Sequence, residues 1–229
     1  MAKVLFTAAV ADARGKLNGT VFSKNRGGAY IRTKVSPVNA QTPAQQGVRA
    51  SLSNFAQAWR GLTANQRAGW NGAVENYKKT DIFGNSRNPS GFNLYVRLNQ
   101  NLSTISQTPI DDAPLPSSVG SPGALTVTAA AGTPALSIAF ANAPVPADTT
   151  MVIQGTAQVS QGKNFVKNLF RQFRLVVAAG TSPVNALAAY NTKFGTLVAG
   201  TKIGIRAYYI SDLTGIAGIA ETATVIVAA

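Results

Sequence analysis

The chain has 229 residues, a formal net charge of +13, eight acidic residues, and neither Cys nor His. Without Cys and His it lacks the usual zinc and iron–sulfur ligands and the commonest general base, and thiol catalysis and Ser/His/Asp triads are excluded. We therefore expect a protein that is not an enzyme, with no catalytic residue, metal site or cofactor. No apolar run approaches the roughly 18 residues of a membrane span, and the N-terminus lacks an apolar segment of signal length. We expect neither a membrane partner nor export by a classical signal.

The positive charge is concentrated in the first half of the chain. Residues 1–110 contain 14 Lys and Arg against three acidic residues, whereas residues 111–229 contain seven against five. This asymmetry indicates that the first half meets a negatively charged partner.

The first predicted element is a basic β-hairpin. Residues 20–24 and 29–35 alternate apolar and polar side chains and are rich in β-formers, and the turn-like residues 25–28 separate them. Residues 14–19, just before the hairpin, predict a loop or an extended arm. The glycines of both segments are interpreted as turn residues, because neither segment contains a phosphate-binding motif.

The side chains of this region form the candidate interaction surface. Clustered Lys and Arg suit phosphate contacts and aromatic rings can stack on bases, but no named nucleic-acid-binding motif is present. We expect docking on an acidic protein surface, with nonspecific DNA contact and a merely solvated charged face as the alternatives. The candidate residues are Arg14, Lys16, Lys24, Arg26, Tyr30, Arg32 and Lys34.

Three helices are predicted next. Thr42 and Pro43 are a start signal, and apolar residues then recur at spacings of four and three, which indicates one helix face. Thr63 is a second N-cap, and a third helix is expected after Ser90. The first helix is expected to bury Val48, Leu52, Phe55, Trp59 and Leu62, and the third Leu94, Leu98, Leu102 and Ile105. Trp59 and Trp70 are interpreted as core residues.

The second half of the chain changes to an alternating pattern. Six apolar runs, separated by Gly, Pro and Asn turns, predict strands at 124–130, 135–141, 149–159, 170–179, 201–211 and 221–228. One helical segment is expected at 184–194. The residues I-x-I-x-A-Y-Y-I-S-D-x-x-G (203–215) resemble the closing hairpin of a fibronectin type III domain.

These patterns together predict two domains. The first, residues 1–106, is an α+β docking domain with a basic β-hairpin and about three helices. Residues 107–123, rich in Pro and Gly, are expected to be a linker. Residues 124–229 are expected to form an all-β sandwich similar to immunoglobulin or fibronectin type III domains.

A second basic cluster falls within the strand expected at 170–179. Strand alternation predicts residues 171 and 173 on one face and residues 170, 172 and 174 on the other. Charged and aromatic side chains are therefore expected on both faces. This mixture indicates an interface, or an exposed edge that is protected by its charges.

The first half also contains the segments KLNGTVFSKNRGGAYIRTKVSPVNAQTPAQ (16–45), QAWRGLTANQRAGW (57–70) and DIFGNS (81–86). These segments, within residues 14–105, resemble a family of uncharacterised proteins encoded by tailed bacteriophages and prophages, frequently among structural genes. The resemblance implies localisation in the virion and no catalytic residues.

We therefore expect a non-enzymatic structural protein associated with the capsid as an auxiliary, minor or decoration protein. Its expected partners are coat, portal or tail subunits, and it is expected to be oligomeric or present in many copies. A tail or connector component, a nonspecific nucleic-acid-binding protein and a host-surface adhesion module at residues 122–229 remain as alternatives.

Overall fold

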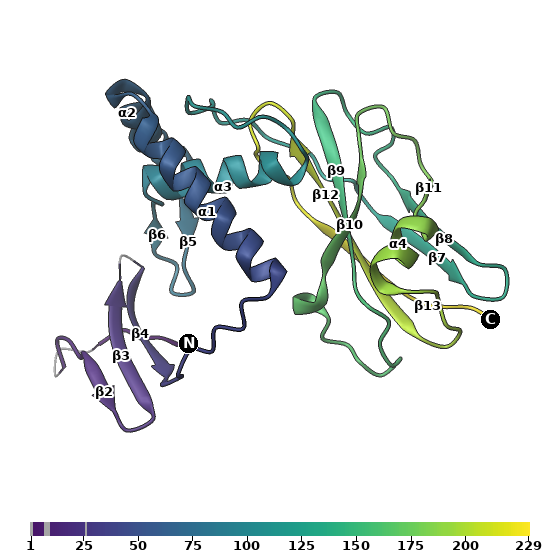
Figure 1. Cartoon of the computed structure of the whole chain (residues 1–229), viewed down its shortest axis with the longest axis horizontal. Coiled ribbons are helices and arrows are strands. Elements are labelled where there is room, and N and C mark those ends of the chain that lie inside the picture. The colour runs from purple at the N-terminus through teal and green to yellow at the C-terminus, as the bar shows by residue number, and fades with distance from the viewer. Residues whose placement is uncertain (1, 7–9, 26) are drawn as a thin grey trace. The chain divides into compact units, whose positions relative to one another are not determined.

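The computed structural model describes residues 2–6, 10–25 and 27–229 and divides the chain into two compact units. Unit 1 comprises residues 1–52 and 78–88, and unit 2 comprises residues 53–77 and 89–229. The described residues of the whole chain form a mixed α/β protein with four α-helices and several antiparallel sheets (Figure 1). No helix among them is long and apolar enough to cross a membrane.

Unit 1 contains a four-stranded antiparallel sheet in the order β1-β4-β3-β2. Its strands are β1 (Ala2–Lys3), β2 (Gly15–Leu17), β3 (Thr20–Asn25) and β4 (Gly28–Thr33). The predicted hairpin corresponds to β3 and β4. The prediction of a loop or arm at 14–19 was wrong, because Asn18, at a φ of 49°, and Gly19 form a tight turn that pairs Leu17 with Thr20.

A second, two-stranded sheet in unit 1 is the hairpin of β5 (Lys79–Thr80) and β6 (Ser86–Arg87). The loop between its strands turns at Gly84, whose φ of +82° is a conformation that glycine adopts without steric cost.

Three helices start at the predicted caps. The amide of Gln45 donates to Thr42 Oγ1 at 3.3 Å, Thr63 and Gln66 form a reciprocal capping box, and Ser90 accepts from the amide of Asn93. The helices are α1 (Pro43–Gly61), α2 (Ala64–Ala73), which continues into the short 3-10 helix η1 (Val74–Tyr77), and α3 (Gly91–Thr104).

Unit 2 also contains two antiparallel sheets, with the strand orders β10-β9-β12-β13 and β11-β8-β7. Each predicted run corresponds to a strand, and the helical segment expected at 184–194 corresponds to β11 and α4. The elements are β7 (Leu125–Ala130), β8 (Ala135–Phe140), β9 (Thr149–Gly155), η2 (Lys167–Leu169), β10 (Arg171–Val176), β11 (Val184–Asn185), α4 (Leu187–Phe194), β12 (Lys202–Ser211) and β13 (Glu221–Ile226).

The central strands β9 and β12 are buried on both faces. One hydrophobic core joins their inner side chains, such as Ile153, to those of the other sheet, such as Ile138. On the outer face, Val152 and Ile210 pack against Leu102 of α3. Unit 2 therefore contains α2 and α3 together with the β-sheets. The sequence had instead predicted the helices in the first domain, residues 1–106, and the sheets in the second, residues 124–229.

The segment 107–123, predicted to be a linker, packs in part against α3. Asn99 is fully buried, and its side chain forms two hydrogen bonds with the backbone of Ile110. Its Oδ1 accepts from the Ile110 amide at 2.7 Å, and its Nδ2 donates to the Ile110 oxygen at 3.0 Å. This double contact fixes the chain just after α3.

Strand β10 contains a bulge that changes which face its side chains occupy. Gln172 lies opposite Gln154, whereas Arg174, two residues later, lies opposite the adjacent Ile153. Gln172 and Arg174 therefore lie on opposite faces, and the prediction that they share one was wrong because a bulge inserts an extra residue into the alternation.

Candidate interaction surface on unit 1

The strand register divides the predicted basic residues between the two faces of the unit 1 sheet. Lys16 and Arg32 both lie opposite Val21, so they flank it on one face. Tyr30, two residues before Arg32 on β4, shares this face. Lys24, three residues after Val21 on β3, lies on the opposite face.

The remaining predicted residues lie at the margins of the sheet. Lys34 follows β4, and its amide donates to the Gly19 oxygen at 2.8 Å. Arg14 precedes β2, and its Nε lies 3.0 Å from a carboxylate oxygen of Asp12 on the surface. Arg26 lies outside the described residues. The other predicted cations are exposed, and Tyr30 is half-buried.

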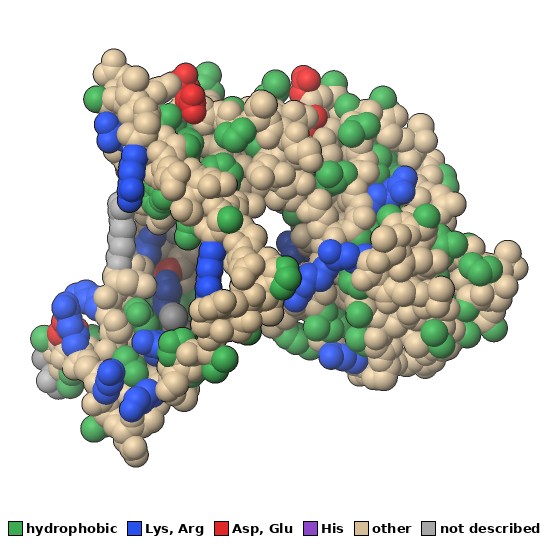
Figure 2. All heavy atoms as spheres, viewed as in Figure 1, with side chains coloured by type: hydrophobic (Ala, Val, Ile, Leu, Met, Phe, Trp, Pro, Cys, Tyr) green, Lys and Arg blue, Asp and Glu red, His purple; other side chains and the backbone are tan. Residues whose placement is uncertain are grey.

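Unit 1 has few acidic residues to neutralise its cations. Figure 2 shows Lys and Arg side chains gathered on this unit. Its sequence contains the eleven cationic residues Lys3, Arg14, Lys16, Lys24, Arg26, Arg32, Lys34, Arg49, Lys78, Lys79 and Arg87 against Asp12 and Asp81. An uncompensated charge of this size favours an acidic partner.

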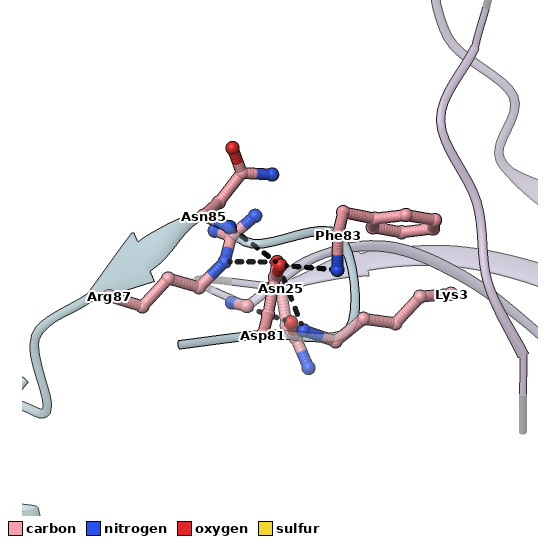
Figure 3. Close-up of polar contacts among 7 residues, drawn as sticks. Lys3, Asn25, Asp81, Phe83, Asn85 and Arg87 are labelled. Atoms are coloured by element: carbon pink, nitrogen blue, oxygen red, sulfur yellow. Dashed lines mark hydrogen bonds and ion pairs between the residues drawn. The ribbon is translucent and has the colours of Figure 1, made fainter. Parts of the chain in front are cut away.

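Asp81 is a buried hub that joins three parts of unit 1 (Figure 3). Its side chain is 3% exposed, and its Oδ2 lies 3.3 Å from Lys3 Nζ and 3.1 Å from Arg87 Nε. Its Oδ1 accepts from the amides of Phe83 at 2.9 Å and Asn85 at 3.1 Å. One carboxylate thus links β1 to the β5–β6 hairpin and orders the turn between the hairpin strands.

The electrostatics of the hub keep this carboxylate ionised. Burial alone would raise the pKa of Asp81, but the amide of Phe83, the Arg87 guanidinium, the amide of Asn85 and the Lys3 ammonium together outweigh it. The pKa of Asp81 is therefore held well below its ordinary value. The DIFGNS segment thus has an internal structural role, which the sequence did not predict.

Unit 1 has almost no hydrophobic core. Val21, at 8% exposure, is the one buried hydrophobic side chain among its described residues, and the buried hydrophobic clusters consist of unit 2 residues. Its large exposed apolar side chains are Leu5, Val10, Leu17, Val35, Val38, Val48, Leu52, Ile82 and Phe83. Exposed apolar side chains beside cations are typical of an interaction site.

The most extended part of this surface is residues 34–50, each of which is exposed. It contains the irregular segment 34–42 and the start of α1. The predicted apolar stripe of α1 is only partly buried, because Val48 and Leu52 are 71% and 51% exposed while Phe55 is buried. The first half of the stripe thus has no apolar cover within the described chain.

Comparison with known proteins gives no match, whether with family models, curated proteins or solved structures. No group of three or more metal-binding side chains occurs in the described part of the chain. Unit 1 combines a small sheet with little hydrophobic core, a cationic face and an exposed apolar segment.

Proposed function

We propose that this chain is a non-enzymatic structural protein of a tailed-phage virion, associated with the capsid as an auxiliary, minor or decoration protein and docked through unit 1. The observation that supports docking is that the described residues of unit 1 bury one hydrophobic side chain and expose nine large ones. A segment that cannot bury its own apolar side chains becomes ordered when a partner covers them. The virion as the setting is inferred from the resemblance of segments within residues 14–105 to an uncharacterised family encoded by tailed bacteriophages and prophages, frequently among structural genes.

The chemistry of the surface favours an acidic protein as the partner. Phosphate groups would neutralise Lys16 and Arg32 but would leave Leu17 and Val35 in contact with water. A protein interface combines an apolar centre with a polar rim, and so accommodates both kinds of side chain. A second copy of the same surface would add like charge. A coat, portal or tail subunit with acidic residues beside apolar pockets fits best.

Unit 2 has a different role in this proposal. Its two antiparallel sheets share one core, which supports an immunoglobulin- or fibronectin type III-like sandwich. Such a domain decorates or bridges the particle while unit 1 docks.

Nonspecific nucleic-acid binding is the second candidate, because Lys16, Tyr30 and Arg32 share one face of the sheet. It predicts binding to double-stranded DNA that weakens steeply with salt and is lost when Arg32 and Lys34 are changed to Glu. Undetectable binding at low salt would exclude this candidate.

Mass spectrometry of purified particles tests the proposal. Tailed-phage particles from cells that encode this chain are separated on a density gradient, and the chain is quantified against the coat protein in each fraction. We expect it to co-migrate with intact particles in a fixed ratio to the coat protein. Its absence from washed particles would contradict a virion role.

A further inference from the structure

Unit 2 contains an open hollow of about 690 Å³ beside strand β10. β10 is the outermost strand of its sheet, and α4 lies next to it. The residues lining the hollow from β10 are Gln172, Phe173, Arg174 and Leu175, and those from α4 are Ala189, Thr192 and Lys193. No acidic residue lines it.

The bulge in β10 determines how this hollow is built. Phe173 is the extra residue, and its ring packs edge-on against Tyr190 and Phe194, with centroid distances of 5.7 and 5.9 Å. This aromatic contact fixes the bulge against α4. Arg174 consequently lies on the face that α4 covers, whereas regular alternation would have placed it on the opposite face.

Arg174 is left with an unsatisfied donor. Its Nε is buried and has no hydrogen-bond partner, and a guanidinium does not lose its proton in proteins. A buried donor without an acceptor is unfavourable, so Arg174 gains from an acceptor that its guanidinium turns to meet. Lys193 lines the same hollow and forms no ion pair within the described residues, so it adds a second positive charge.

Arg171, on the same strand, differs from Arg174 in that its guanidinium has hydrogen-bond partners. Its guanidinium donates to the backbone oxygens of Asn168 at 3.1 Å and Phe170 at 2.8 Å. A charge that protects an exposed strand edge from pairing with another strand does not need a buried, unsatisfied N–H. The prediction of a charge-protected edge therefore accounts for Arg171 better than for Arg174.

We propose that this hollow binds an oxoanion group, either a carboxylate or a phosphate. Arg174 binds it through its guanidinium, whose neighbouring N–H groups offer the paired geometry that carboxylates and phosphates accept. Lys193 adds a second positive charge. The proposal rests on unit 2 alone and is independent of docking through unit 1.

The test is a titration of the full-length, isotope-labelled chain followed by NMR at low ionic strength. The two probes are inorganic phosphate and N-acetylglutamate methylamide, which presents a peptide-like carboxylate. We expect saturable shifts at residues of the hollow with at least one probe, and the tighter probe identifies the anion source. Arg174→Gln should weaken binding by about fivefold or more, and Lys193→Gln by about twofold.

Arg171→Gln is the matched control, because it removes the same charge from the same strand. It should leave the dissociation constant within about twofold of the original value. Arg174→Lys keeps the positive charge but not the paired donors of the guanidinium. It should bind the anion almost as weakly as Arg174→Gln, and this comparison distinguishes a loss of donor geometry from a loss of folding. Equal weakening in the Arg171 and Arg174 variants, or no saturation by about 50 mM of either probe, would overturn the proposal.

Discussion

The indole Nε1 of Trp70 donates a hydrogen bond of 2.7 Å to the backbone oxygen of Asp111. Trp70 is fully buried in α2, and its ring meets Tyr95 of α3 edge-on at a centroid distance of 5.3 Å. Asp111 belongs to the Pro-rich segment that the sequence predicts as a linker. The bond makes that part of the segment a packed component of unit 2.

Trp70→Phe should therefore destabilise unit 2 by about 2–4 kcal/mol, because it leaves a cavity and removes the donor to the Asp111 oxygen. Urea unfolding followed by circular dichroism measures the change. Trp59→Phe is the control, because Trp59 is half-buried and no hydrogen bond of its indole is seen in the described chain. Its expected cost is about 1 kcal/mol, and a cost as large as that of Trp70→Phe would speak against this role of the Asp111 contact.

Gly215→Ala should destabilise unit 2 by about 2 kcal/mol or more. Gly215 has a φ of +69°, and a Cβ there would clash with the Leu98 backbone oxygen. Gly200→Ala is the matched control, because Gly200 also has a positive φ, of +76°, but a Cβ there would meet only the Gln161 side chain at 3.7 Å, an ordinary contact. The control measures the backbone strain alone, about 1 kcal/mol, and thermal melts of both variants should differ by the cost of the clash. Equal melting temperatures would show that the loop after β12 moves away from α3 at little cost.

The Asp81 hub should make unit 1 sensitive to acid. The pKa of Asp81 is lowered in the folded chain, so the folded form binds fewer protons than the unfolded form. Its stabilising effect should be complete above about pH 5 and should be lost progressively as the pH falls further. Hydrogen exchange of the β5–β6 amides, measured from neutral pH to about pH 3, should show this loss after correction for intrinsic rates.

Asp81→Asn should remove this acid dependence and leave the β5–β6 amides poorly protected at neutral pH. Asp12→Asn provides the control, because it changes an exposed ion pair with Arg14 and should leave the hairpin protected. If the β5–β6 amides of Asp81→Asn still lost protection as the pH fell, a titratable group other than Asp81 would be responsible for the acid sensitivity.

Reversing charge on the cationic face should reduce incorporation into particles. The double variant Lys16→Glu with Arg32→Glu should lower the amount of chain per particle by about tenfold, since both residues flank Val21 on one face. The matched reversal in unit 2, Lys167→Glu with Arg171→Glu, changes the net charge equally and should retain near-normal incorporation. Similar losses in both variants would indicate that net charge alone governs incorporation.

Sequence patterns predicted the local elements of this fold well. Thr63 and Ser90 cap helices because capping depends on a few neighbouring residues, and the strands follow an alternation that one strand displays by itself. The turn that creates β2 was missed although its signal, Asn18-Gly19, is present. Asn-Gly between extended residues is a strong hairpin indicator.

Features that depend on distant residues could not be predicted. The composition of residues 107–123 is the same whether they tether two domains or pack against Asn99 and Trp70. The stripe of α1 does not indicate which half is covered, since Val48 and Phe55 differ only in what lies nearby. Mixed charged and aromatic residues likewise gave no sign of the bulge at Phe173.

The candidate surface was predicted as six cations and Tyr30, and its described cations are exposed on unit 1. Only the strand register shows which face of the sheet each cation occupies. It places Lys24 on the face opposite to that of Arg32. The exposed apolar residues were missed, because a sequence shows that Leu17 or Phe83 is apolar but not whether the fold buries it.

The most direct test of docking through unit 1 is hydrogen exchange of the free chain compared with the chain in purified particles. We predict that amides of the irregular residues 35–42, which donate no hydrogen bond seen in the described chain, exchange rapidly in the free chain and become strongly protected in the particle, with little change in the strands of unit 2. Equal exchange of residues 35–42 in both states would contradict docking through this surface.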